Sequence, residues 1–358
     1  MEQRDYSHHI FLLLMIITFI IVATVLKLTA SFFVPVTISV LIAFVFFPFL
    51  KKMHESKIKV PWILGIIIVV LIAIFFFFIL GNLLVASFKT ILQSLPKYEA
   101  RFTVITNTFL EKFKLSDLEK SELLSKFFST SEINSLLKNS ILSISNYILN
   151  SGKNILLISL FVVFLLIEMK NLYPKVLNAF PEGRTSKKII IIATKIISQV
   201  THFISIKFLV SLITGFLVYL VCAIVKMDFA ILWGFFAFIL NFIPNFGSII
   251  SWVITSVFAI LQFYPHAAIP VTVSVLVLAI NMIFGNIVEP RWEGEDLGLS
   301  PFVILVSLSL WTWLWGFVGA ILAVPLTVII KIICENIEFL KPVAVLMGTS
   351  SKRKRKHL

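Results

Sequence analysis

The stretch FAILWGFFAFILNFIPNFGSIISWVITSVFAILQFYPHAAIPVTVSVLVLAINMIFGNIV, residues 229–288, contains no Asp, Glu, Lys or Arg. A helix needs roughly 20 apolar residues to cross a hydrocarbon core of about 30 Å, so an uncharged run of this length must fold back on itself within a membrane. Transmembrane β-strands would alternate polar and apolar residues, and this stretch does not. It therefore predicts several membrane-embedded α-helices.

Uncharged runs also dominate the rest of the chain. With residues 229–288 they cover more than half of its 358 residues, and the others are 10–26, 28–50, 60–88, 154–167, 208–225 and 297–330. Hydrophobic residues make up 59% of the chain and charged residues 14%, which excludes a soluble enzyme, a disordered chain and a secreted disulfide scaffold. We predict an all-α polytopic membrane protein with about eight membrane-embedded segments, two of them broken or re-entrant helices.

The net charge of +13 is concentrated in three regions. The basic residues of these regions are Lys51, Lys52, Lys57 and Lys59; Lys170, Lys175, Arg184, Lys187 and Lys188; and Lys352, Arg353, Lys354, Arg355 and Lys356. Basic loops stay on the cytoplasmic side of a membrane, so we expect both termini to be cytoplasmic and residues 89–153 to be external. The basic tail is interpreted as a topology anchor beside lipid head groups, and nucleic acid is not an expected partner.

The charge pattern predicts five parts of the chain. These are 1–88, the first three spans; 89–153, an external amphipathic helical segment; 154–207, a fourth span with a cytoplasmic basic and amphipathic segment; 208–335, a transport core with broken helices; and 336–358, a basic cytoplasmic tail. Cys222 and Cys334 lack metal-ligand spacing and are expected to be buried thiols. We expect neither a metal nor a cofactor.

The first candidate site is the sequence Asn-Phe-Ile-Pro-Asn-Phe-Gly at 241–247. A proline removes a backbone donor and a glycine accepts unusual dihedrals, so Pro244 and Gly247 predict a break in the helix. Irregular backbone at membrane depth is tolerated where it is buried in protein or lines a cavity. Asn241, Asn245 and Ser248 would then offer polar groups to a solute or a cation; the alternative is hydrogen bonding between helices.

The second candidate site lies where the long uncharged run ends, at Asn281, Asn286, Glu289 and Arg291. A carboxylate inside a membrane can exchange a proton or bind a cation, which makes Glu289, together with Arg291, a candidate for coupling. The alternative is an ion pair with Arg291 that holds a tight loop. Glu168 is a similar residue, expected at the cytoplasmic interface. Asn281 and Asn286 are candidate substrate-binding residues, as are Asn241, Pro244, Asn245, Gly247 and Ser248 of the first site.

Two segments of the second half resemble each other. Trp233–Leu240 and Trp315–Leu322 share Trp, Gly, Phe, Ile and Leu at a constant offset of 82, and each soon reaches a proline, Pro244 or Pro325. Paired interruptions of this kind indicate a transporter site. We expect 229–263 and 302–333 to be either two full crossings or two re-entrant hairpins. The candidate hinges are Gly294, Pro301, Gly316 and Pro325.

Three of these stretches resemble the autoinducer-2 exporter family, also called PerM-like permeases. The resemblance is carried by LWGFFAFILNFIPNFGSII (232–250), GNIVEPRWEGEDLGLSP (285–301) and WGFVGAILAVPLTVIIK (315–331), and it extends over essentially the whole chain. The chain departs from the family pattern in the acidic residues beside Gly294, namely Glu293, Glu295 and Asp296, and in Glu168, where members more often carry Asp.

The resemblance implies a multi-pass transporter of the bacterial inner membrane, often a homo-oligomer, working by alternating access. Family members are described as exporters of the signalling molecule autoinducer-2 or as sodium(lithium)/proton antiporters. The expected partner is a small polar solute or a monovalent cation, with 241–248 as its cradle and Glu289 as the coupling residue. A passive channel and a non-transporting membrane scaffold stay open. An enzyme is not expected, because the chain has no His-Glu-x-x-His or Gly-x-Ser-x-Gly motif.

Overall fold

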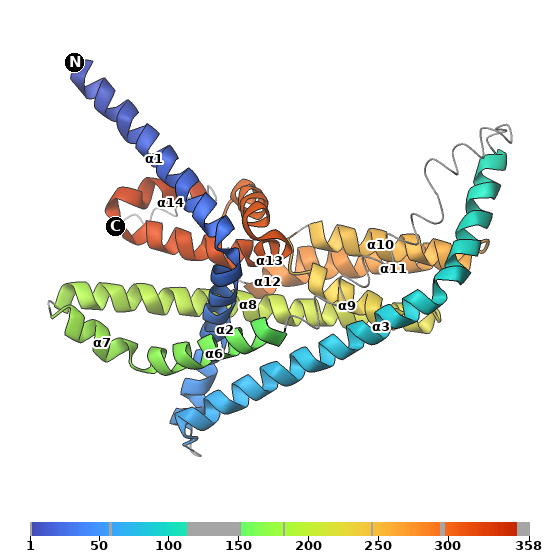
Figure 1. The fold of residues 1–358 in the computed structure, drawn as a ribbon, viewed down its shortest axis with the longest axis horizontal. Helices are drawn as coiled ribbons and strands as arrows, with labels where there is room; N and C mark the ends of the chain where they lie inside the picture. The colour runs from blue at the N-terminus through green and yellow to red at the C-terminus, as the bar shows by residue number, and fades with distance from the viewer. Residues whose placement is uncertain are drawn as a thin grey trace, which may run out of the picture. The chain divides into compact units, whose positions relative to one another are not determined.

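The computed structural model describes residues 2–56, 59–112, 152–181, 183–244, 246–293 and 298–348 (Figure 1). Within these ranges the regular structure is helical, apart from an isolated β-bridge between Leu299 and Gly348. Seven described helices are long and apolar enough to cross a membrane, and two shorter apolar helices accompany them. The predicted all-α polytopic membrane protein is confirmed.

The helices follow the uncharged runs, because only a helix satisfies every backbone donor and acceptor within lipid. In chain order they are α1 (Glu2–Leu28), α2 (Ala30–Glu55), α3 (Trp62–Lys112), α6 (Gly152–Lys170), α7 (Leu172–Ala179), α8 (Gly183–Ile224), α9 (Ala230–Leu240), α10 (Phe246–Phe263), α11 (Ala268–Ile283), the π-helix η1 (Phe284–Val288), α12 (Glu289–Glu293), α13 (Pro301–Asn336), the short 3₁₀-helix η2 (Glu338–Leu340) and α14 (Lys341–Met347).

The chain forms two compact units from non-contiguous stretches. Unit 1 comprises residues 1–70, 156–204 and 295–358, and unit 2 comprises residues 71–155 and 205–294. The helices α3, α6 and α8 each contribute residues to both units. The long α3, drawn from blue to teal in Figure 1, continues as helix past residue 88 to Lys112. Residues 113–151, most of the predicted external segment, lie outside the described residues.

Unit 2 contains the predicted break between α9 and α10. Helix α9 ends at Leu240 and α10 begins at Phe246. The chain doubles back there, since the ring centroids of Trp233 and Phe258 lie 4.8 Å apart. With 11 residues, α9 is about 16 Å long, well short of a hydrocarbon core. The broken helix is confirmed, and the segment 229–263 is a hairpin rather than one full crossing.

Unit 1 contains a second hairpin, within α13. Gly316 has φ 62° and ψ −141°, a conformation that glycine adopts readily and other residues do not. The arms on either side of it lie together, because the hydroxyls of Ser307 and Thr327 form a hydrogen bond. The predicted pair of broken helices is therefore present, with one hairpin in each unit.

The two glycines that match at the offset of 82 have different roles in the structure. Gly234, the counterpart of Gly316, lies inside α9, where a Cβ would come within 2.7 Å of the Gly215 carbonyl oxygen. Gly234 is thus needed for a close helix crossing, whereas Gly316 is needed for a positive φ. The second helix also continues through Pro325, so the hinge of this segment is Gly316 and not Pro325.

The other two predicted hinges are Pro301 and Gly294. Pro301 is the first residue of α13, a position where its missing N–H costs nothing and its fixed φ suits the helix. The hydroxyl of Ser300 caps this helix by accepting a hydrogen bond from the Val303 amide at 3.2 Å. Pro301 therefore starts a helix, in place of the predicted hinge. Gly294 lies outside the described residues.

The apolar core of unit 2 joins four helices, α8, α9, α10 and α11; α10 and α11 lie side by side (Figure 1). Its buried members are Val218, Cys222, Met227, Trp233, Ala237, Ala259, Val273 and Val277. Cys222 in this core and Cys334 in unit 1 are both buried free thiols, as predicted. We call these eight buried residues the apolar plug.

Candidate functional site

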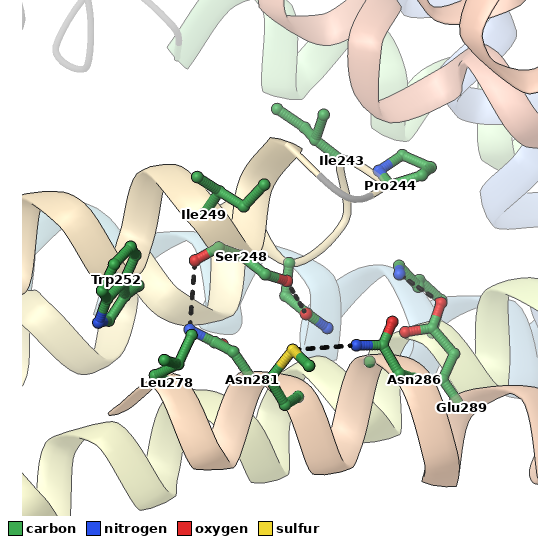
Figure 2. A pocket seen from close by; sticks show the side chains of 13 residues that line it. Ile243, Pro244, Ser248, Ile249, Trp252, Leu278, Asn281, Asn286 and Glu289 are labelled. Carbon is green, nitrogen blue, oxygen red and sulfur yellow. Dashed lines mark hydrogen bonds and ion pairs between the residues drawn. The ribbon is translucent and has the colours of Figure 1, made fainter. Parts of the chain in front are cut away.

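A cavity of about 470 Å³ opens at the α9–α10 break, entirely within unit 2 (Figure 2). This volume falls within the range of small-molecule binding sites. The cavity is bounded by α8, by the turn after α9, by α10 and by the continuous segment from α11 to α12. It is lined by Lys207, Asn241, Ile243, Pro244, Ser248, Ile249, Trp252, Leu278, Asn281, Met282, Gly285, Asn286 and Glu289.

Hydrogen bonds tie the predicted amide and hydroxyl groups together at the break. The Asn241 amide donates to Ser211 Oγ at 3.0 Å, and the Ser248 hydroxyl donates to Asn241 Oδ1 at 3.4 Å. The Asn281 amide donates to the Ser248 carbonyl at 3.2 Å (Figure 2). The alternative interpretation of Asn241, hydrogen bonding between helices, is therefore realised. Asn241, Ser248 and Asn281 also line the cavity, so the polar groups of this network border it.

The wall that carries Asn286 is a single π-helical turn, Phe284–Val288. Isolated π-turns occur frequently at functional sites, because the extra residue displaces the normal ladder of hydrogen bonds. The Asn286 amide donates to Met282 Sδ at 3.3 Å. A Cβ on Gly285 would meet nothing within 4 Å, so the cavity extends directly beside that backbone.

Glu289 forms an ion pair with Lys207 of α8 at the end of the cavity, with Nζ and Oε1 2.5 Å apart. The lysine side chain is 6% exposed and the glutamate side chain 14%. The predicted alternative partner, Arg291, is exposed and does not line the cavity. In place of the alternative, a local Glu289–Arg291 pair, α8 supplies the cation, and the ion pair links two helices rather than holding a loop.

The sequence pattern did not single out Lys207 or Trp252. Lys207 is the last charged residue before the uncharged run 208–225. This position indicates a lysine at the edge of a membrane span, but it does not indicate which residue the lysine pairs with. Trp252 lines the cavity, and its indole N–H donates to the carbonyl and to Oγ of Ser274, both at 3.0 Å. It fixes α10 against α11 at the level of the cavity.

Four other predicted site and hinge residues do not appear among the described residues that line the cavity. Gly247 is buried in the first turn of α10 and does not line the cavity, and Asn245 lies outside the described residues. Gly316 and Pro325 belong to unit 1 and do not line this cavity. Among the described residues, no group of three or more His, Cys, Asp or Glu side chains is arranged to hold a metal ion.

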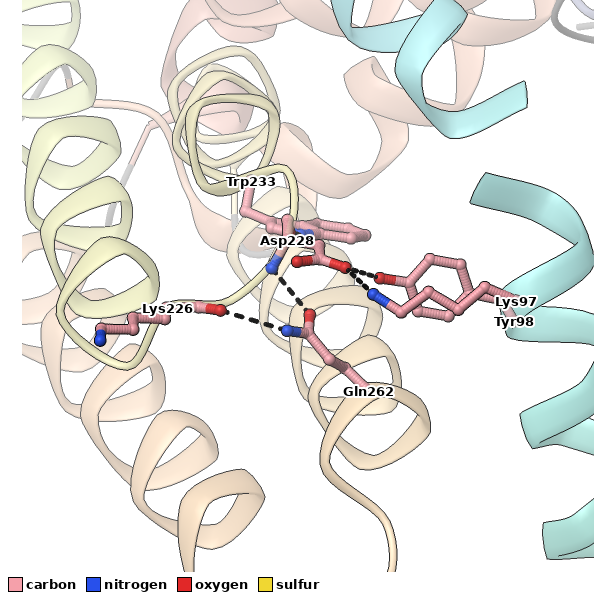
Figure 3. Close-up of polar contacts among 6 residues, drawn as sticks. All are labelled: Lys97, Tyr98, Lys226, Asp228, Trp233 and Gln262. Atoms are coloured by element: carbon pink, nitrogen blue, oxygen red, sulfur yellow. Dashed lines mark hydrogen bonds and ion pairs between the residues drawn. The ribbon is translucent and has the colours of Figure 1, made fainter. Parts of the chain in front are cut away.

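A second polar cluster lies beyond the apolar plug, at the other end of α8 and α10 (Figure 3). Asp228 accepts hydrogen bonds from Lys97, at 2.7 Å, and from the Tyr98 hydroxyl. The Asp228 amide donates to Gln262 Oε1 at 2.7 Å, and the Gln262 amide donates to the Lys226 carbonyl at 3.2 Å. The cluster fastens α3 and the end of α10 to the loop between α8 and α9.

Burial by itself raises the pKa of the Asp228 carboxyl, but hydrogen bonds from Lys97 and Tyr98 and the charges of Lys97 and Arg101 bring it below its usual value. Burial and the neighbouring carboxylate raise the pKa of the Tyr98 hydroxyl. These two pKa shifts keep the Asp228 carboxylate charged and the Tyr98 phenol protonated at neutral pH. This is the state in which Tyr98 donates its hydrogen bond to Asp228.

The lowered pKa of Asp228 predicts a pH dependence. A carboxyl with a depressed folded pKa stabilises the protein above its unfolded pKa of about 3.9, and this contribution disappears as the pH falls through the folded value. Melting temperatures of wild type and Asp228→Asn should therefore differ by a constant amount at neutral pH and converge below about pH 4. Lys97→Met should weaken the same pH dependence, and parallel curves for wild type and Asp228→Asn down to the lowest pH would contradict the assignment.

Comparisons with known proteins place the whole chain among transport proteins. Residues 10–339 match the model of the family described as AI-2E family transporter. A putative transport protein of Haemophilus influenzae is 33% identical over 343 residues, covering 94% of this chain and 95% of its own. A putative transport protein of Borreliella burgdorferi is 31% identical over 90% of this chain and 86% of its own. The AI-2 transport protein TqsA of Escherichia coli is 29% identical over 93% of this chain and 94% of its own.

Proposed function

The chain belongs to the AI-2E transporter family, and we propose that it is a secondary transporter that moves a small polar solute across the bacterial inner membrane by alternating access. The observation that carries the proposal is the cavity at the α9–α10 break, where amide and hydroxyl groups converge among apolar helices. Irregular backbone is tolerated there only because it is buried in protein or faces a cavity. Transporters of other folds also place their sites at broken helices.

The residues have separate proposed roles. Asn241, Ser248 and Asn281 form the polar cradle, since their side chains both donate and accept hydrogen bonds. Trp252 and Leu278 supply the apolar wall that most small-molecule sites also have. The two hairpins, at 241–245 and at Gly316, are the elements that change position between the outward-facing and inward-facing states.

The buried ion pair supplies the proposed coupling. Protonation of Glu289, or binding of a cation in place of the Lys207 ammonium, would break the pair and free both side chains. The alternative of sodium(lithium)/proton antiport uses the same carboxylate and differs only in what fills the cavity. Cytoplasmic termini and a homo-oligomeric assembly belong to the same proposal and stay predictions.

A cavity-filling variant tests the proposed site. Gly285→Leu places a side chain in open space beside the cavity, so the fold should tolerate it. In proteoliposomes loaded with AI-2 or xylitol, efflux should fall by at least about tenfold, which corresponds to a loss of about 1.4 kcal/mol. Gly183→Leu is the matched control, since a Cβ on Gly183 also meets nothing within 4 Å and Gly183 does not line the cavity.

The same vesicles separate the candidate functions. Saturable efflux of a polyol or AI-2 that Gly285→Leu abolishes supports the transporter. Sodium- or lithium-driven proton movement without solute flux supports the antiporter, and flux that does not saturate supports a channel. Unchanged transport in Gly285→Leu would remove the cavity from the mechanism, and unchanged proton-coupled flux in Glu289→Gln would remove Glu289 from coupling.

A further inference from the structure

The buried face of α10 is polar for three turns where an apolar face is expected. Its fully buried residues recur at helical spacing on one side: Gly247, Ser251, Thr255, Ala259 and Gln262. Ser251 and Thr255 are 2% and 1% exposed. Neither hydroxyl has a hydrogen-bond partner. These two side chains continue, one turn at a time, the line that begins with Ser248 in the cavity.

Helix α8 carries a similar line, starting from the same end. Lys207 and Ser211 belong to the site already described, through Glu289 and Asn241 respectively. Thr214 follows Ser211 by three residues, which places it on the same face. It is 0% exposed, and its hydroxyl is also without a hydrogen-bond partner.

Among the described residues of unit 2, four buried hydroxyls have no hydrogen-bond partner, and three of them, Thr214, Ser251 and Thr255, lie on the two lines that continue from the cavity. Most Ser and Thr side chains in membrane helices bond to the carbonyl one turn earlier, as Thr272 does here to Ala268 at 2.9 Å. A buried hydroxyl that makes no bond costs free energy, and Ala or Val in its place would not. Groups of this kind are expected where a polar molecule binds during part of the protein's cycle.

The line of hydroxyls ends at the apolar plug. Beyond Thr214 on α8 lie Val218 and Cys222, and beyond Thr255 on α10 lies Ala259, all members of the plug. On the far side of the plug, Gln262 joins the Asp228 cluster (Figure 3). Along α8 and α10 the order is thus the cavity-lining residues, the buried hydroxyls, the apolar plug and the Asp228 cluster.

We propose that Thr214, Ser251 and Thr255 form a second, deeper solute subsite of unit 2, which the solute enters from the cavity before it passes the apolar plug. The inference rests on the proposed transport function and specifies its substrate class. The side chains of the subsite are hydroxyls without charge, and hydroxyls both donate and accept hydrogen bonds. They suit a neutral, polyhydroxylated molecule, whereas a bare cation needs several oxygen ligands around it or a carboxylate.

Conservative removal of the hydroxyls tests the subsite. Thr214→Val, Ser251→Ala and Thr255→Val keep the shape of the core, so melting temperatures should be unchanged or higher, because an unbonded polar group is removed. Efflux of xylitol from proteoliposomes should nevertheless fall by about tenfold in each variant, the effect of losing one well-placed hydrogen bond to the solute. If a hydroxyl has only a structural role, its removal should leave xylitol efflux as in the wild type, whatever its effect on the melting temperature.

Ser256→Ala is the matched control. Ser256 also carries a buried hydroxyl without a partner, but it is rotated about 100° from Thr255 around α10, away from the line. Its removal should leave xylitol efflux as in the wild type. Equal efflux in wild type and in the three subsite variants overturns the subsite and leaves the proposed transporter intact.

The wild-type protein in the same vesicles tests the two proposals separately. Wild-type flux of sodium without flux of xylitol or glycerol overturns the neutral substrate class of the subsite. Wild-type vesicles that move no solute and no ion overturn the transport function itself, before any variant is compared.

Discussion

Lys207→Met is expected to destabilise the protein by about 3–5 kcal/mol, because the substitution leaves the Glu289 carboxylate buried without its cation. The two side chains are 6% and 14% exposed, so the carboxylate stays largely shielded from water when its ammonium partner is removed. The measurement is unfolding of the purified protein in detergent, followed by helical circular dichroism at a fixed pH near 7. Loss of solute flux should accompany the loss of stability.

Removal of both charges should restore most of this stability. In Lys207→Met/Glu289→Gln no charge is left unpaired, and replacing a buried pair by neutral residues is often neutral or stabilising. The double variant should therefore fold well and still lack coupled transport. This combination separates the coupling role from a structural one, since stability returns and flux does not.

An exposed ion pair of unit 1 provides the control. Lys195 lies 2.8 Å from Glu335, with side chains 42% and 35% exposed. Such pairs contribute about 0–1 kcal/mol, so Lys195→Met should change stability little. A similar small effect of Lys207→Met would show that the Lys207–Glu289 pair is hydrated, and would contradict its role in coupling.

The α9–α10 break was predictable because its cause is local. Pro244 lacks a backbone donor and Gly247 accommodates close approach, and both properties belong to residues within one turn of the chain. The partner of Glu289 was not predictable for the opposite reason. Lys207 lies on α8, and the helices α9, α10 and α11 and the π-helical turn η1 separate it from Glu289 in sequence. Helix packing alone therefore decides which cation meets the carboxylate.

The different roles of the matched glycines Gly234 and Gly316 could not be predicted for a similar reason. A match of apolar residues at a fixed offset does not show whether a glycine is required for its backbone dihedrals or for its lack of a Cβ. At Gly234 the neighbouring backbone of Gly215 requires the small residue, whereas at Gly316 the positive φ requires it. The buried hydroxyls of α10 were equally hidden, because Ser and Thr are common in membrane helices and only burial without a partner makes them unusual.

Gly247→Ala and Gly319→Ala should each force apart the two arms of one hairpin. An added Cβ would lie 1.7 Å from the Leu240 carbonyl oxygen in the first case and 1.9 Å from the Trp311 carbonyl oxygen in the second. These are backbone atoms, so no rotamer change relieves the contact and the arms must separate. We expect losses at or above about 3 kcal/mol, the upper end for overpacking a well-packed core. Unfolding in detergent measures them.

Substitutions at two other glycines distinguish the cost of steric crowding from the cost of backbone strain. Gly316→Ala adds a Cβ that meets nothing within 4 Å, but at φ 62°, so it should cost about 1–3 kcal/mol through conformation alone. Gly285→Ala has open space and no positive φ, and should be neutral or stabilising by up to about 1 kcal/mol. A Gly247→Ala protein as stable as Gly285→Ala would mean that the arms of the first hairpin are not closed in the way described. The cradle of Asn241 and Ser248, which depends on that closure, would then lose its geometric basis.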